Sequence, residues 1–315
     1  MLALLLTAVL TPPAPADAPP SPTEQRALAD AVAAKAQRAE VRTDDDGNVT
    51  GLILINHQAL HQKVGEKPGA DDDDLLSLAA LPKLDTLVLE SQPVTDRGLA
   101  VLNRFPGMKQ VGFHYMGKAW ATFAADRDLS PVSPGFVTRI DPMRDLEILE
   151  IKHNFKVDAI AVDALKGPFP KVWRLVLDTP VTAEQTLHLA RLCPHVRDLQ
   201  LHRTDLSPEQ LTELGALLPK LEVLWFKPRG GLKAEHLRAL AAFPKLRIFS
   251  PQHFKNAVPY AGGWDALAAH PALERLEIAG RGAQTNAAAL EELTTARPGL
   301  VVSPKLTRSR NYDGL

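Results

Sequence analysis

The sequence predicts one curved α/β solenoid, with parallel strands on its concave face and helices on its convex face. Three observations carry this prediction: a short apolar motif recurs at nearly constant spacing, prolines precede most of its copies, and helix-start signals follow them. The composition agrees, because 45% of the 315 residues are hydrophobic and 23% are charged, as in ordinary globular proteins.

The repeated motif has the form apolar-x-x-apolar-x-apolar. Eight copies begin at Val49, Leu84, Met108, Leu146, Val172, Val196, Leu221 and Leu273. A ninth, weaker copy begins at Leu246, and Leu300 begins a truncated one. Successive copies lie 24 to 27 residues apart, except for two steps of 35 and 38 residues. A period in this range is typical of stacked repeat proteins.

Each repeat is expected to contain a strand, a polar turn and a helix. Thr95, Thr182 and Ser207 stand at N-cap positions, and Pro208 occupies a first helical position. A proline after an apolar residue ends most of the expected helices, as at Phe105, Phe169, Cys193, Leu218 and Phe243. Parallel strands lie about 4.8 Å apart and helices are about 10 Å across, so a stack of such units must curve.

The unit at residues 84–102 resembles the leucine-rich repeat superfamily, in its bacterial, helix-backed form with ribonuclease-inhibitor-like repeats. The resemblance covers roughly residues 24–302. It extends to the entrance, where a helix at 23–39 and two strands around the turn at 44–48 look like a helix-plus-hairpin cap. The residue that follows the strand, usually Asn or Thr in such repeats, is Gln92, Asn154 and Thr204 in some units and is displaced in others. We therefore expect the turn geometry to vary along the array.

The chain is expected to divide into three parts. These are a signal peptide or disordered Pro-Ala segment at 1–18, a single repeat domain at 19–304 and a polar tail at 305–315. Within the domain we expect the cap at 21–54, repeats from about 49 to 302, and an insert at 117–141. The insert accounts for the longer of the two irregular steps, and its aromatic residues and prolines suggest that it folds over the edge of the array.

The N-terminus favours export. An apolar run at 2–10 is followed by a Pro/Ala-rich stretch at 11–20, as in a secretory signal. The apolar run is too short to span a bilayer. We therefore expect a periplasmic or secreted protein that is not inserted in a membrane. No Lys or Arg precedes Arg26, so a disordered tail or a misassigned start codon, and with it a cytoplasmic location, is the alternative.

Charge and cysteine content exclude several function classes. The 36 Lys and Arg nearly balance the 37 Asp and Glu, giving a net charge of −1, so we expect no nucleic-acid partner. Cys193 is the one cysteine in the sequence, which excludes an internal disulfide and thiolate-rich metal sites.

No convincing catalytic or metal-binding set is found in the sequence. Cys193 and His195 suggest a nucleophile and base, but Cys193 aligns with the buried residues that end other helices. His57 and His61 have helical ligand spacing without the glutamate of a zincin motif. The acidic run 71–74 lacks the spacing of a calcium loop, and we expect Asp74 to cap a helix there. We expect a protein that is not an enzyme and carries no metal or cofactor.

Two rows of residues are expected to face outward from the strands. The row after the first core position reads Asp85, Lys109, Glu147, Trp173, Arg197, Glu222, Arg247 and Glu274. Its alternating charges predict a ladder of ion pairs between neighbouring strands. The central row reads Ile53, Val88, Gly112, Glu150, Val176, Gln200, Trp225, Ser250 and Glu277.

The central row predicts a binding patch around Trp225. Trp225, Val223 and Ile248 would form an apolar centre with Val176 nearby, because side chains alternate along a strand. The expected polar rim consists of Asp198, Gln200, His202, Lys227 and Arg174. An aromatic anchor within a polar rim is typical of a protein-binding hot spot. Trp225 lying flat over its neighbours, or beneath the C-terminal tail, is an equally open alternative.

The sequence therefore predicts a monomeric, non-enzymatic protein–protein interaction module that binds an unknown protein or peptide on its concave face. Its patch would consist of Trp225, Val223, Ile248, Val176, Gln200, His202, Lys227 and Arg174. The alternative is a carbohydrate or cell-envelope polymer binder that uses Trp225, Trp173 and His202.

Overall fold

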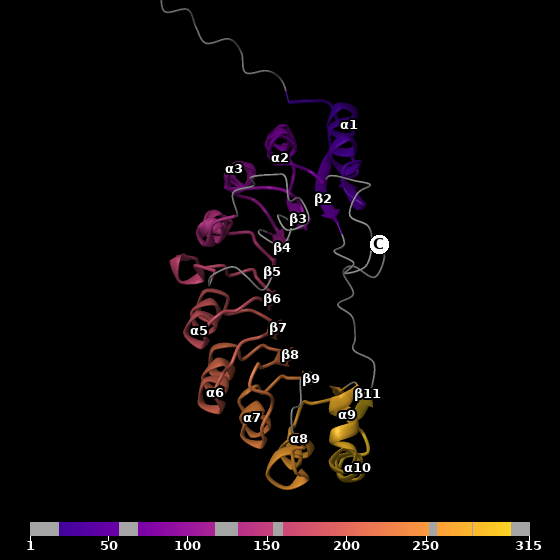
Figure 1. Cartoon of the computed structure of the whole chain (residues 1–315), viewed down its shortest axis with the longest axis vertical. Helices are drawn as coiled ribbons and strands as arrows, with labels where there is room; N and C mark the ends of the chain where they lie inside the picture. The colour runs from indigo at the N-terminus through magenta and orange to yellow at the C-terminus, as the bar shows by residue number, and fades with distance from the viewer. Residues whose placement is uncertain are drawn as a thin grey trace, which may run out of the picture.

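Strands from every repeat join one open sheet in the computed structural model. The structure describes residues 19–56, 69–116, 132–153, 160–251, 257–278 and 280–303. Within these residues the sheet has 11 strands in the order of the chain, β1 to β11. β1 pairs antiparallel with β2, and all the following neighbours pair in parallel. Figure 1 shows the strands stacked along the inside of an arc, as the sequence predicts for a curved solenoid.

The strands are short and regularly spaced. They are β1 (Arg38–Thr43), β2 (Val49–Ile55), β3 (Thr86–Glu90), β4 (Gln110–Met116), β5 (Ile148–His153), β6 (Arg174–Asp178), β7 (Asp198–His202), β8 (Val223–Lys227), β9 (Ile248–Pro251), β10 (Arg275–Glu277) and β11 (Val301–Ser303). The eight predicted copies and the weaker ninth each supply one strand, and the truncated copy at Leu300 precedes β11.

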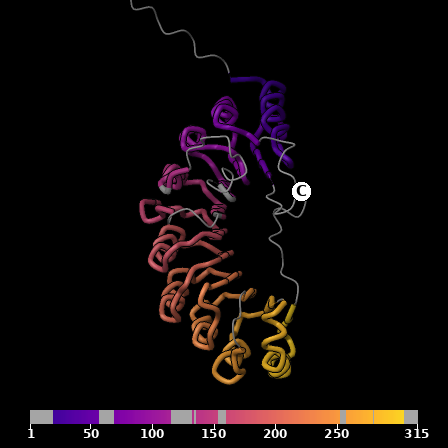
Figure 2. The backbone as a smooth tube through the Cα atoms, viewed as in Figure 1, coloured from indigo at the N-terminus to yellow at the C-terminus, as the bar shows by residue number. Residues whose placement is uncertain are grey.

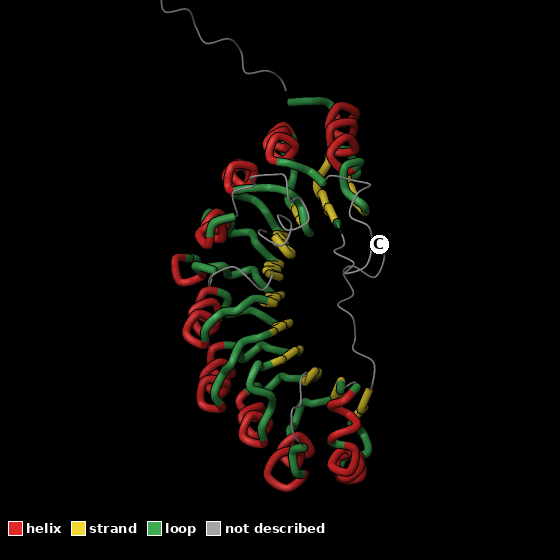
Figure 3. Tube along the Cα trace, viewed as in Figure 1, coloured by secondary structure: helices red, strands yellow, loops and turns green. Residues whose placement is uncertain are grey.

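Helices cover the outer side of the sheet, as Figure 3 shows. The α-helices are α1 (Pro22–Ala33), α2 (Asp72–Ser77), α3 (Asp96–Leu99), α5 (Ala183–Leu192), α6 (Pro208–Leu217), α7 (Ala234–Ala239), α8 (Asp265–Ala269), α9 (Arg281–Thr285) and α10 (Ala287–Ala296). The 3-10 helices lie at Leu78–Ala80, Ala100–Arg104, Pro134–Ile140, Val162–Ala164 and Leu240–Ala242. No helix of the described ranges is both long and apolar enough to cross a bilayer.

The motif residues form one continuous core between the sheet and the helices. Leu175, Leu199 and Leu224 are neighbours on successive strands, and all are buried. Because each strand contributes the same three positions, every repeat buries its apolar side against the next one. The backbone trace in Figure 2 shows this stacking from the first strand to the last.

The helix starts follow the predicted N-caps, with one correction. The side chains of Thr95, Thr182 and Ser207 each accept a hydrogen bond from a backbone N–H of the first turn. In the acidic run, however, Asp71 and not Asp74 is the N-cap of α2. Asp74 stands three residues later and accepts a hydrogen bond from the Asp71 backbone, which completes a capping box.

The first helix is shorter than the sequence predicts. The expected helix at residues 23–39 ends at Ala33, and the backbone is extended from Arg38. Residues 38–43 instead pair with β2, which gives the outer edge of β2 a partner. Pairing with β2 satisfies backbone groups that a longer helix would have used, and this accounts for the early end.

Part of the long step between Met108 and Leu146 belongs to the core. Val137 and Ile140 are buried, and the ring of Phe136 meets that of Phe113 edge-on, with centroids 4.8 Å apart. Residues 132–141 therefore supply the helical side of this repeat. Residues 117–131, which hold the rest of the predicted insert, lie outside the described residues.

Candidate functional site

The structure brings the predicted patch together in register across four strands. Val176, Gln200 and Trp225 are successive neighbours on β6, β7 and β8, and Val223 is the neighbour of Ile248 on β9. Leu224 and Phe226, on either side of Trp225, are fully buried in the core. Alternation along the strand therefore turns Trp225 toward the concave face.

Exposure is concentrated at the β8 and β9 end of the patch. Trp225, Val223 and Ile248 are half-buried. Val176 is only 1% exposed and Gln200 only 7% exposed, so both offer little surface to a partner. The three half-buried apolar side chains on two adjacent strands are thus the apolar part of the patch that a ligand can reach.

The rim residue Arg174 belongs to a buried ion network. Its side chain is 4% exposed, with Nε 3.2 Å from Glu150 Oε1 and Nη1 3.2 Å from Asp198 Oδ2. Glu150, with a fully buried side chain, is also approached by His114 Nε2 at 2.9 Å and by Lys152 Nζ at 3.5 Å. The network therefore runs across β4, β5, β6 and β7 beside the apolar patch.

The pKa values of two carboxyl groups of this network are shifted in opposite directions. Burial raises the pKa of Glu150, but the hydrogen bond from His114 and the charges of Lys152, His114 and Arg174 outweigh it and hold this pKa at about 2. At Asp198, burial outweighs the attraction of Arg174, so its pKa is raised. Glu150 is thus the anion on which the surrounding cations converge.

The other rim residues stand at the carboxyl ends of the strands. His202 and Lys227 are neighbours on β7 and β8. Burial, together with the charges of Lys227 and Lys152, lowers the pKa of His202 despite the attraction of Asp178, which favours the neutral imidazole. Asp178 lies 3.3 Å from Arg203. Within the described ranges, Lys227 has no ion-pair partner, so its ammonium is available to an acidic group of a ligand.

The outward row at the start of the strands forms the predicted ladder in part. Lys109 Nζ lies 2.8 Å from Asp85 Oδ2, and Arg247 Nη2 lies 2.8 Å from Glu274 Oε2. Trp173 and Arg197 interrupt the ladder. The indole carries no charge, and the Arg197 guanidinium forms no ion pair with a described residue. An unpaired cation and an indole are therefore left side by side at this edge.

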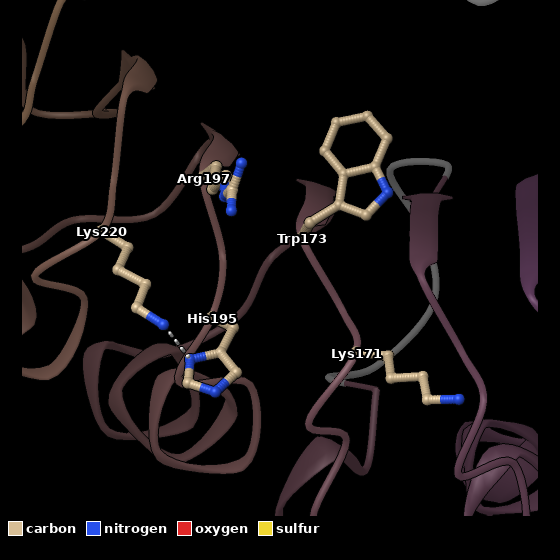
Figure 4. Close-up of a pocket in the computed structure, with 5 residues that line it drawn as sticks. All are labelled: Lys171, Trp173, His195, Arg197 and Lys220. Carbon is tan, nitrogen blue, oxygen red and sulfur yellow. Dashed lines mark hydrogen bonds between the residues drawn. The ribbon is translucent and has the colours of Figure 1, made fainter.

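A pocket of about 450 Å³ opens at this interruption, where β6, β7 and β8 begin. Figure 4 shows the five residues that line it: Lys171, Trp173, His195, Arg197 and Lys220. Lys220 Nζ lies 3.3 Å from His195 Nδ1, and the ammonium donates a hydrogen bond to this ring nitrogen. Lys171 lies 2.5 Å from Asp145 Oδ1. The polar lining of the pocket consists of cations and one imidazole.

The residues considered for chemistry in the sequence do not assemble into a catalytic set. Cys193 is fully buried, and burial raises the pKa of its thiol to about 12, so it is the core residue that its alignment predicts. His57 and His61 lie outside the described residues. Across the described part of the chain, no group of three or more His, Cys, Asp or Glu side chains could hold a metal ion.

Sequence reasoning missed two features of the concave face. Glu150 stood in the central row, but the approach of His114 from β4 and Arg174 from β6 depends on strand register. The basic pocket joins the outward row with a second row, the residues after the helix-ending prolines. That second row reads Lys171, His195 and Lys220 in successive repeats, so aligning the repeats could have revealed it.

Comparison with known proteins gives similarity to solved structures only. No family model matches the chain, and no curated protein matches its sequence. A Bacteroides fragilis protein of known structure is 14% identical, with a TM-score of 0.41, over 74% of this chain and 60% of that one. This chain thus spans less than two thirds of the length of that protein. A chain of the yeast Rad7 and Elc1 complex is 14% identical, with a TM-score of 0.42, over 92% of this chain and 87% of that one.

Proposed function

We propose that this protein is a leucine-rich repeat interaction scaffold whose concave strands bind another protein beside Trp225. The observation that carries the proposal is the half-buried apolar cluster of Trp225, Val223 and Ile248 on two adjacent strands. A rigid stack of repeats holds these side chains in fixed positions, so little conformational freedom is lost when a partner binds.

The surroundings of Trp225 favour a partner of particular chemistry. The indole is large enough to bury an apolar side chain of the partner, and such aromatic anchors dominate the binding energy of many interfaces. Lys227, two residues further along β8, has no ion-pair partner among the described residues. We infer that the partner presents an apolar side chain to Trp225 and an Asp or Glu to Lys227.

The first test compares two variants, each of which replaces an apolar side chain with glutamate. Trp225→Glu puts a carboxylate at the centre of the cluster, and Val301→Glu puts one on β11, where Val301 is 52% exposed. A partner captured by the unaltered protein is purified, and its dissociation constant is measured with all three proteins after circular dichroism shows that each is folded. We expect Trp225→Glu to weaken binding about 100-fold or more, as at a hot spot, and Val301→Glu to leave it within a factor of about two.

Equal binding to all three proteins would show that the cluster does not hold the partner. A captured ligand that withstands proteinase, is lost on enzymatic deglycosylation and binds Trp225→Glu more weakly than the unaltered protein would replace the protein partner at this surface with a carbohydrate. Either result would overturn the proposal, because it names both the ligand class and the surface.

A further inference from the structure

Stacking of the repeats places five side chains of matching position around the pocket at the start of β6 to β8. Lys171, His195 and Lys220 each follow the proline that precedes a repeat motif, and Trp173 and Arg197 occupy the next outward position in their repeats. Neighbouring parallel strands lie about 4.8 Å apart. Equivalent residues of successive repeats therefore line one pocket, and no inserted loop is needed to bring them together.

Two side chains of the pocket have hydrogen-bond donors without a partner among the described residues. No described residue forms an ion pair or hydrogen bond with the Arg197 guanidinium, so both of its donor edges are open to a ligand. The Trp173 indole N–H likewise lacks a hydrogen-bond partner among the described residues. In Figure 4 Arg197 lies between the Trp173 indole and Lys220, and His195 lies below Arg197.

The charges around the pocket select an anion of limited size. Asp145 already pairs with Lys171, whereas Lys220 has no carboxylate partner among the described residues and contacts His195. Glu147 and Glu222 flank Trp173 and Arg197 in the same outward row. The cationic surface is therefore confined to the pocket, which suits one acidic group and not a long phosphate backbone.

We propose that this pocket binds an acidic saccharide, a sugar unit that carries a carboxylate or sulfate group. The apolar C–H face of the sugar ring packs on the Trp173 indole, and the indole N–H donates to a ring hydroxyl. The acidic group accepts hydrogen bonds from Arg197, whose planar fork matches a carboxylate, and from Lys220. A pocket of about 450 Å³ is within the usual range for small-molecule sites.

An acidic peptide fits these observations less well. The backbone N–H groups of Trp173, Arg197 and Glu222 all donate to the preceding strand, so none is open to the main chain of a peptide at this edge. A free carboxylate would use Arg197 and Lys220 and leave the indole uncovered. A ring with an acidic substituent uses both halves of the pocket.

The test uses a short galacturonate oligomer and its methyl ester, which has the same rings without the charge. Binding to the full chain is followed by tryptophan fluorescence and by isothermal titration calorimetry. We expect saturable binding of the acid, with at least about tenfold weaker binding of the ester. Arg197→Gln and Trp173→Ala should each weaken binding of the acid about tenfold or more.

Two variants serve as matched controls. Arg247→Gln changes the equivalent position of a later repeat, where the arginine is paired with Glu274, and should leave sugar binding unchanged. Trp225→Ala should also leave it unchanged, which separates this site from the protein-binding surface. Binding of the ester as tight as that of the acid, unchanged binding by Arg197→Gln, or full displacement by equimolar sulfate or polyglutamate would overturn the proposal.

Discussion

Replacing Glu150 with alanine is expected to lower the free energy of unfolding by about 3–5 kcal/mol, since it leaves buried cations without their anion. Arg174, with a 4% exposed side chain, would keep only the pairing with Asp198, whose pKa is raised by burial. The matched control is Glu213→Ala, because Glu213 pairs with Arg191 on the exposed side of the helices. A surface pair of this kind contributes about 0–1 kcal/mol. Urea denaturation of the three proteins measures both differences.

The Glu150 carboxylate also makes the free energy of unfolding depend on pH. The pKa of Glu150 falls from its ordinary value of 4.5 in the unfolded chain to about 2 in the folded protein. Its contribution, on the order of 3 kcal/mol, is therefore complete above pH 4.5 and is lost as the pH falls from 4.5 to 2. Asp198 acts in the opposite direction, because its raised pKa favours folding as acid is added. The stability of Glu150→Gln should decline less steeply over this interval, and equal slopes would show that Glu150 is not held as an anion.

Replacing Phe226 with alanine is expected to cost about 3–5 kcal/mol, the usual range for deleting a buried aromatic ring. Phe226 is fully buried and contacts the ring of His236 from the next helix, with centroids 6.2 Å apart. Val223→Ala, on the same strand, is the control: its side chain is half-buried on the concave face, and its loss should cost about 1 kcal/mol or less.

The two values test the orientation of β8. If Val223→Ala destabilised the protein as strongly as Phe226→Ala, the strand would not turn Val223 and Trp225 outward as described. Thermal unfolding followed by circular dichroism would give the same ranking as urea, provided that each variant unfolds in a single transition.

The repeat could be predicted from the sequence because its signal is local and is repeated. Leu175, Leu199 and Leu224 each stand at the same place in a motif, and the structure buries all three. The caps at Thr182 and Ser207 were equally predictable, since a capping box spans four residues. The prediction of Asp74 as the N-cap of α2 was wrong because four consecutive aspartates offer several N-cap candidates, and backbone geometry selects Asp71 among them.

The ion network could not be predicted in the same way. Glu150, His114 and Arg174 come from three repeats, and their contact depends on register and on which way each long side chain turns. Arg174 was expected at the rim because side chains alternate along a strand. Alternation predicts the face of the sheet on which a side chain lies, but not how deeply that side chain is buried. Trp225 needed no such information, because its position between two core residues determines the face that it occupies.

The most direct test of the concave-face account is photo-cross-linking from two fixed positions. Ile248, the neighbour of Val223 on the concave face, and Thr212, exposed on α6, are each replaced by p-benzoylphenylalanine in otherwise unaltered protein. After irradiation with the purified partner, the account predicts a covalent adduct from position 248 and none from position 212. An adduct from position 212 without one from position 248 would place the partner on the helices and contradict the account.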